Sequence, residues 1–208
     1  MAVLHFQKHE PNNFSDSNPI LILLHGRGAD EFDLLPIGEI INKNFLTFSI
    51  RAPKKFIYGG YTWFSLSDKM EINDDEFYSS FCDLNETINF ILQNYKNRKI
   101  FLLGFSQGAI MSYSIGLTRS KDFTGIIAQS GFLFESNKIA IDWKNISNLK
   151  FLHTHGLFDT AVPIETAYTT KNIFENNYKN FELKTYQMGH EINQPCLSDV
   201  TNWVNHLI

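Results

Sequence analysis

Cysteine, basic clusters and long apolar runs are all scarce in this 208-residue chain. Its 2 cysteines, Cys82 and Cys196, lack the spacing of metal ligands, so we expect reduced structural thiols and no metal site. No apolar run approaches the length that spans a bilayer, and residues 1–8 lack the apolar core of a secretory signal peptide. We therefore expect a cytoplasmic protein without stable membrane insertion.

The charge balance limits the partners further. The net charge is −4 and Lys and Arg form no block, so we expect no nucleic-acid partner. The hydrophobic content of 43% and the 19 phenylalanines can fill a sizeable core. No repeat, low-complexity tract or linker divides the chain, which predicts one domain over residues 1–208.

Strand patterns alternate with helical patterns along the chain. Strands are expected at 20–24, 45–50, 100–103, 125–128, 149–153 and 181–186. Helices are expected at 32–41, 77–95, 109–115, from Pro163 onward, and at 197–207. This alternation is typical of an α/β fold with a mostly parallel central sheet and helices on both faces. Two stretches fall outside it, 54–75 and 132–148, and both are too short for a large lid.

The most informative motif is Gly104-Phe105-Ser106-Gln107-Gly108, between a predicted strand and a predicted helix. A G-x-S-x-G sequence in this context is typical of a nucleophile elbow, a strained turn that exposes a serine hydroxyl at the sheet edge. The flanking glycines would leave room for the neighbouring strand and helix. The alternative is an ordinary glycine-rich turn between a strand and a helix.

An acid and a histidine follow Ser106 in the chain order that such sites use. Asp159 and His190 each come just after a predicted strand, and open parallel sheets bind ligands at that edge. Asp159 could instead be the N-cap of the helix that starts near Pro163, and His190 an ordinary loop histidine. The order and the shared placement favour a Ser-His-Asp triad.

The loop after strand 20–24 reads His25-Gly26-Arg27-Gly28. In a triad hydrolase, the backbone N–H groups of Arg27 and Gln107 would form the oxyanion hole, and losing one such donor costs about 3 kcal/mol. A weaker alternative is a dinucleotide-binding turn. Glu31 occupies the sixth position, where that turn needs Gly or Ala, although Arg51 could meet the extra phosphate of NADP.

Together these motifs resemble the phospholipase/carboxylesterase family of α/β-hydrolases, which includes small bacterial carboxylesterases and acyl-protein thioesterases. The likeness covers nearly the whole chain and rests on His25-Gly26-Arg27-Gly28-Ala29-Asp30, Arg51-Ala52-Pro53, Gly59-Gly60-Tyr61, Trp63-Phe64, Gly104-Phe105-Ser106-Gln107-Gly108, His155-Gly156 with Asp159, and Gly189-His190-Glu191. The resemblance implies Ser106 as nucleophile, His190 as general base and Asp159 as its orienting acid. Many family members carry an apolar residue where this chain has Arg27.

The aromatic loop at 54–75 supplies candidates for the substrate pocket. We expect Tyr61, Trp63, Phe64 and Leu66 to line it, unless they only pack the loop onto the core. The resemblance adds Ala161 and Val162.

The predicted function is a serine carboxylesterase for short-to-medium acyl esters, with a small-molecule ester substrate, no cofactor and a possible homodimer. Thioesterase and lysophospholipase activities remain open, because they use the same triad. A non-catalytic binding protein and an NADP-dependent oxidoreductase are the alternatives from other classes.

Overall fold

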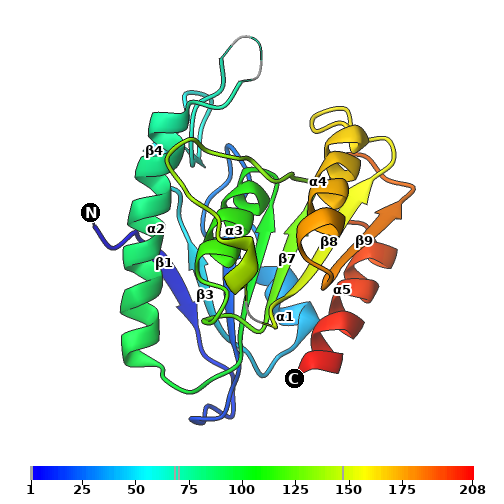
Figure 1. The fold of residues 1–208 in the computed structure, drawn as a ribbon. Helices are drawn as coiled ribbons and strands as arrows, with labels where there is room; N and C mark the ends of the chain where they lie inside the picture. The colour runs from blue at the N-terminus through cyan, green and yellow to red at the C-terminus, as the bar shows by residue number, and fades with distance from the viewer. Residues whose placement is uncertain (1, 68, 70, 147) are drawn as a thin grey trace.

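A seven-stranded sheet in the order β1-β3-β2-β6-β7-β8-β9 forms the centre of the molecule. Figure 1 draws it in the computed structural model, which describes residues 2–67, 69, 71–146 and 148–208. The strands are β1 (Phe6–His9), β2 (Ile20–Leu24), β3 (Leu46–Ile50), β6 (Ile100–Phe105), β7 (Gly125–Gln129), β8 (Lys150–Gly156) and β9 (Phe181–Tyr186). Only β1 runs antiparallel to its neighbour, so the predicted mostly parallel sheet is confirmed.

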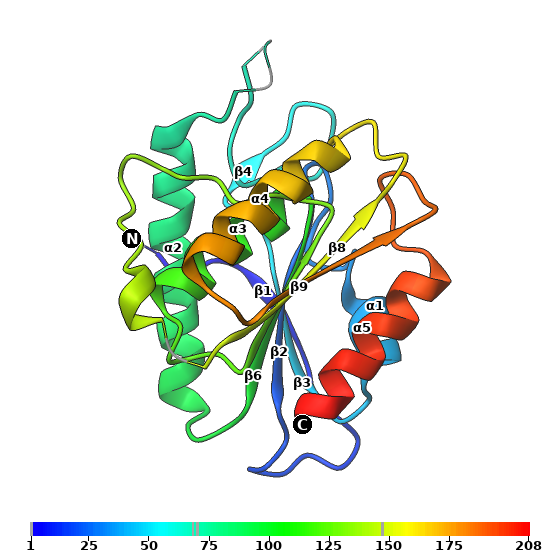
Figure 2. The same ribbon diagram turned by 45° about the vertical axis from the view of Figure 1, so that its right-hand side comes forward.

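Helices cover both faces of this sheet, as predicted. They are α1 (Leu35–Ile41), α2 (Asp74–Asn94), α3 (Gln107–Thr118), α4 (Ile164–Asn177) and α5 (Gln194–Leu207). Helices α2, α3 and α4 lie on one face, and α1 and α5 lie together on the other (Figures 1 and 2). Each face has its own apolar core, and adjacent side chains of β6 enter opposite cores, Leu102 on the α3 side and Leu103 on the α5 side. Strands with helices on both faces are apolar at nearly every position, so they could be predicted from the sequence.

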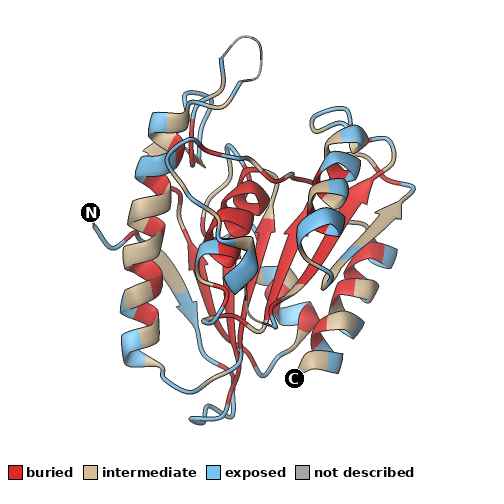
Figure 3. Ribbon diagram, viewed as in Figure 1, coloured by how far each residue is buried: buried red, intermediate tan, exposed pale blue. Residues whose placement is uncertain are grey.

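Helix α3 is the central element of the α2–α4 layer. Its residues 107–117 are all buried, and Figure 3 shows it almost entirely in the colour of buried residues. A helix buried all round cannot shift without disturbing its neighbours. The residues at its N-terminus are therefore held firmly at the carboxyl edge of the sheet.

The predicted helix at 32–41 is wrong at its start. Helix α1 begins only at Leu35, and Phe32 is exposed. Pro36 lies in the first turn of α1, where a backbone N–H has no partner within the helix, so its absence costs nothing. In a helix that began at Phe32, Pro36 would lie in the second turn and would disrupt the hydrogen bonds. The residues before it form turns, and Asp30 Oδ1 accepts a hydrogen bond from the Phe32 N–H at 2.9 Å.

Some elements were not predicted. Strand β1 was missed, and so was a small hairpin of β4 (Lys54–Lys55) and β5 (Tyr61–Thr62) in the aromatic loop. The stretch 132–148 contains one short 3-10 helix, Trp143–Asn145, and no lid is present in the described part of the chain. Among the described helices, none is both long and apolar enough to cross a membrane.

Candidate active site

Ser106 lies on a sharp turn between β6 and α3. Its backbone has φ 55° and ψ −117°, a strained combination for a residue with a side chain. The turn needs both flanking glycines. A Cβ on Gly104 would lie 2.2 Å from the Gly108 carbonyl oxygen, and a Cβ on Gly108 would lie 2.0 Å from the Leu24 carbonyl oxygen. The local geometry is therefore that of a nucleophile elbow rather than an ordinary turn.

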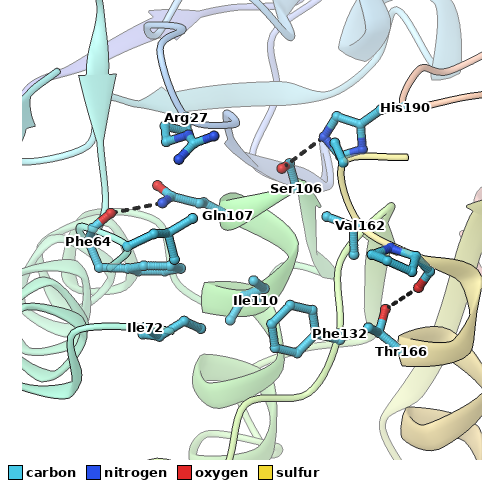
Figure 4. Close-up of a pocket in the computed structure, with 13 residues that line it drawn as sticks. Arg27, Phe64, Ile72, Ser106, Gln107, Ile110, Phe132, Val162, Thr166 and His190 are labelled. Carbon is cyan, nitrogen blue, oxygen red and sulfur yellow. Dashed lines mark hydrogen bonds between the residues drawn. The ribbon is translucent and has the colours of Figure 1, made fainter. Parts of the chain in front are cut away.

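The structure brings Ser106, His190 and Asp159 together in one hydrogen-bonded row. Ser106 Oγ lies 3.0 Å from His190 Nε2, and His190 Nδ1 lies 2.7 Å from Asp159 Oδ2. Figure 4 shows the first of these contacts at the side of a cleft. A hydroxyl, an imidazole and a carboxylate in this order can activate the hydroxyl as a nucleophile.

Asp159 is held by the turn that follows it. Its Oδ1 accepts hydrogen bonds from the N–H groups of Ala161 at 3.0 Å and Val162 at 2.8 Å, which leaves Oδ2 directed at His190. The cap of α4 is Pro163, without a side-chain hydrogen bond. The alternative role of Asp159 as the N-cap of that helix is therefore wrong.

A buried chain of three polar side chains supports this turn from behind. His155 Nε2 donates to the Val162 carbonyl at 2.8 Å, because that oxygen can only accept. Neutral His155 must then accept at Nδ1 from His153 Nε2 at 3.1 Å, and His153 Nδ1 accepts from the Tyr113 hydroxyl at 2.6 Å. Burial lowers the pKa of both histidines, that of His153 to about 3, so both rings stay neutral near pH 7.

The loop after β2 is fixed by its own histidine. His25 Nε2 accepts from the Ala52 N–H at 3.0 Å, so its Nδ1 donates to the Gly26 carbonyl at 2.7 Å. The indole N–H of Trp63 donates to the His25 carbonyl at 2.9 Å. The backbone around Arg27 is thereby held next to the elbow.

Gln107 joins the turn that carries Ser106 to the aromatic loop. Its Oε1 accepts from the Thr62 hydroxyl at 2.8 Å and the Trp63 N–H at 3.0 Å, and its Nε2 donates to the Phe64 carbonyl at 2.8 Å. The backbone N–H groups of Gln107 and Arg27 have no acceptor among the described residues. They are thus available to bind an oxygen.

A cleft of about 360 Å³ opens at Ser106. It is lined by Arg27, Phe64, Leu66, Ile72, Ser106, Gln107, Ile110, Phe132, Ala161, Val162, Pro163, Thr166 and His190 (Figure 4). Four of the six predicted pocket residues lie in its wall: Phe64, Leu66, Ala161 and Val162. Tyr61 is not among the lining residues; it pairs with Lys55 in the small hairpin.

The prediction for Trp63 is wrong. Trp63 is fully buried and does not reach the cleft, because its indole N–H bonds inside the protein to the loop after β2. The cleft wall also contains five residues that were not predicted from the sequence: Ile72, Ile110, Phe132, Pro163 and Thr166. Ile110 could have been found, since it lies one helical turn after Ser106. Phe132 reaches the cleft from the loop after β7, a placement that no local pattern reveals.

The match to a known family agrees with this geometry. A family model described as phospholipase/carboxylesterase matches residues 12–208. The chain belongs to this family. The likeness to acyl-protein thioesterase 1 of Saccharomyces cerevisiae is 29% identity over 140 residues, which span 64% of this chain and 61% of that protein. The likeness to acyl-protein thioesterase 1 of Candida albicans is 24% identity and spans 95% of this chain and 96% of that protein.

Solved structures share the fold of this phospholipase/carboxylesterase family member. A carboxylesterase of Bacillus cereus has a TM-score of 0.87 at 19% identity, covering 100% of this chain and 96% of that one. The esterase PE8 has a TM-score of 0.82 at 22% identity, covering both chains fully. These likenesses confirm the single-domain α/β-hydrolase fold.

The dinucleotide alternative does not fit this family member. Arg51, which was to meet the extra phosphate of NADP, is already engaged by Glu31. Arg51 Nε donates to Glu31 Oε2 at 2.6 Å, and a second bond joins Arg51 Nη2 to Glu31 Oε1. The guanidinium also lies 4.6 Å from the centre of the Tyr61 ring. This pairing lowers the pKa of the Glu31 carboxyl to about 2, so Glu31 and Arg51 form a stable ion pair that braces the loop after β2.

Proposed function

We propose that this protein hydrolyses carboxylic esters of short to medium acyl chains through an acyl-enzyme on Ser106. The observation that carries the proposal is the hydrogen-bonded row Ser106–His190–Asp159 at the side of an apolar cleft. Membership of the phospholipase/carboxylesterase family supports ester cleavage as the class of reaction.

The proposed reaction assigns each group one role. His190 Nε2 accepts the Ser106 proton as Oγ attacks the substrate carbonyl, and Asp159 holds the imidazole in the required tautomer. The N–H groups of Arg27 and Gln107 bind the oxyanion, and His190 then returns the proton to the leaving group. Water, activated by His190, hydrolyses the acyl-enzyme. Donors already fixed in place, as the contacts of His25 and Gln107 indicate, need no rearrangement when the charge develops.

The cleft walls support the proposed substrate class. Phe64, Leu66, Ile72, Ile110 and Phe132 offer an apolar surface for an acyl chain. Each buried CH₂ contributes about 0.8 kcal/mol while it still touches apolar wall. We propose a rise of kcat/KM over the first acyl carbons and a plateau or fall for long chains. Thioesters are a second candidate, because the matched yeast relatives are named acyl-protein thioesterases.

The test replaces the nucleophile. Ser106→Ala should lower kcat for 4-nitrophenyl butyrate by about 10⁵ to 10⁶ and should abolish labelling by a fluorophosphonate probe. Ser79→Ala, at an exposed position of α2, is the matched control and should keep both. Ester hydrolysis by Ser106→Ala at a tenth of the wild-type rate would disprove the assignment. Failure of the wild type to label or to cleave any ester or thioester would favour the non-catalytic binding protein.

A further inference from the structure

Arg27 gives the cleft a charge that ester hydrolysis does not require. Among the lining residues that the structure describes, it alone has a permanent formal charge, and none carries a carboxylate. Its guanidinium has no hydrogen bond or ion pair to a described residue. It lies 5.4 Å from the centre of the Phe56 ring, which orients it without neutralising it.

The backbone of Arg27 is fixed beside the reacting serine. The Gly28 N–H donates to the Tyr61 carbonyl at 2.7 Å, and the Tyr61 N–H donates to the Ala29 carbonyl at 2.8 Å. In Figure 4 the Arg27 side chain lies beside Gln107, and His190 lies on the other side of Ser106. Because Arg27 and Ser106 line the same cleft, one substrate molecule can contact both.

The contrast with two other arginines of the chain strengthens the argument. Arg51 is bound twice by Glu31, and Arg119 by Asp122 at 2.8 Å. Arg27 keeps its donors free at the mouth of an apolar cleft. A guanidinium offers a planar fork of N–H donors that matches a carboxylate or a phosphate. The wall residues would also lower the local dielectric and strengthen such a pair.

We propose that Arg27 forms an anion subsite next to the oxyanion hole, and that the enzyme prefers esters with a carboxylate or phosphate close to the scissile bond. The inference rests on the proposed ester hydrolysis and names its substrate class: an amphipathic ester with a short apolar acyl part and a nearby negative charge. The charge can belong to the leaving group or to the acyl group.

The test compares matched anionic and neutral esters. In the leaving-group arm, 4-carboxyphenyl butyrate is compared with 4-carbamoylphenyl butyrate. In the acyl arm, mono-4-nitrophenyl glutarate is compared with 4-nitrophenyl valerate. The readout is the ratio of kcat/KM values, anionic over neutral, for the wild type, Arg27→Lys and Arg27→Met. Because a loss of the backbone donor affects both esters of a pair, the ratio isolates the side chain.

Because Arg27 is exposed and water screens its charge, we expect the ratio in at least one arm to fall about three- to five-fold in Arg27→Met. Arg27→Lys should keep part of it, and high salt should lower the wild-type ratio. Lys121→Met, beyond the far end of α3 from Ser106, removes the same charge and should leave the ratio unchanged.

Equal ratios for the wild type and Arg27→Met in both arms would disprove the anion subsite while ester hydrolysis stands. If the wild type cleaves none of the four esters, the proposed function fails together with the subsite.

Discussion

The two carboxylate oxygens of Asp159 make different contacts. Oδ1 closes the turn to Ala161 and Val162, and Oδ2 orients His190. An asparagine could keep the first contact, because its carbonyl oxygen also accepts from backbone N–H groups. It would present an NH₂ group to His190 Nδ1, which must be a donor for Nε2 to act as a base. The two functions of this residue can therefore be separated by one substitution.

Asp159→Asn should lower kcat by about 10⁴ with little loss of stability, because the imidazole is held in the wrong tautomer. The measurements are steady-state kinetics on 4-nitrophenyl butyrate and the thermal unfolding midpoint. Asp142→Asn is the control, since among the described residues the Asp142 side chain has a hydrogen bond only to Asn145 of its own short 3-10 turn. A mild effect at Asp159 with a severe one at Asp142 would reverse the assignment.

We expect neither cysteine to take part in catalysis. Cys196 is buried beside Gln129, and burial raises the pKa of its thiol, so it is a poor nucleophile. Cys82 lies on α2, outside the cleft lining. Treatment with iodoacetamide should leave esterase activity largely intact, and Cys82→Ser should turn over substrate like the wild type. Inactivation by iodoacetamide that Cys82→Ser prevents would contradict this.

At the scale of elements, two adjacent residues of the aromatic loop before α2 have different roles. Trp63 points into the core and binds the His25 carbonyl, whereas Phe64 faces the cleft. The sequence could predict that this loop is functional, but not which side chain faces which way. That choice depends on His25, Gln107 and Ser80, whose bonds to the loop come from distant parts of the chain.

This division predicts different results for two aromatic substitutions. Trp63→Ala should destabilise the protein by about 3–5 kcal/mol and lower kcat for all esters alike, because it leaves a cavity and frees the loop after β2. Phe132→Ala should instead move the acyl-length optimum to longer chains, because it opens the cleft wall. A series of 4-nitrophenyl esters from acetate to laurate, with urea unfolding, tests both. If only Trp63→Ala shifted the acyl-length optimum, Trp63 would have to line the cleft.

Elements also show what the sequence could and could not reveal. The alternation of strands and helices and the strand-end positions of Ser106, Asp159 and His190 were readable, because local patterns dictate them. The exposed edge strand β1 was not, since its half-polar sequence gains its structure only by pairing with β3. The chain Tyr113–His153–His155 was equally hidden, because it joins α3 to β8 across the interior.

At the scale of the whole molecule, that buried chain links the catalytic edge to the stability of the fold. His25, His153 and His155 are all buried, and burial lowers the pKa of each below the ordinary value of 6.5. As the pH falls below 6.5, the unfolded chain binds protons at these rings more readily than the folded protein does. The folded state therefore has its full stability from these groups above pH 6.5 and loses it as the pH falls toward their folded pKa values.

The final prediction isolates this effect for His153. Its pKa of about 3 implies a loss of up to about 1.4 kcal/mol per pH unit between pH 6.5 and pH 3. The Glu31–Arg51 pair adds its own loss only below about pH 4.5, where the Glu31 carboxyl would protonate in the unfolded chain. The unfolding free energy measured with urea at several values from pH 5 to pH 6.5 therefore depends on the histidines.

His153→Gln, whose amide can still bond to Tyr113 and His155, should reduce the slope of unfolding free energy with pH by about 1 kcal/mol per unit. His206→Gln removes an exposed histidine of α5 and should leave the slope unchanged. If His153→Gln and the wild type have the same slope, His153 is not a buried neutral ring, and its Nδ1 would then donate to the Tyr113 hydroxyl rather than accept from it.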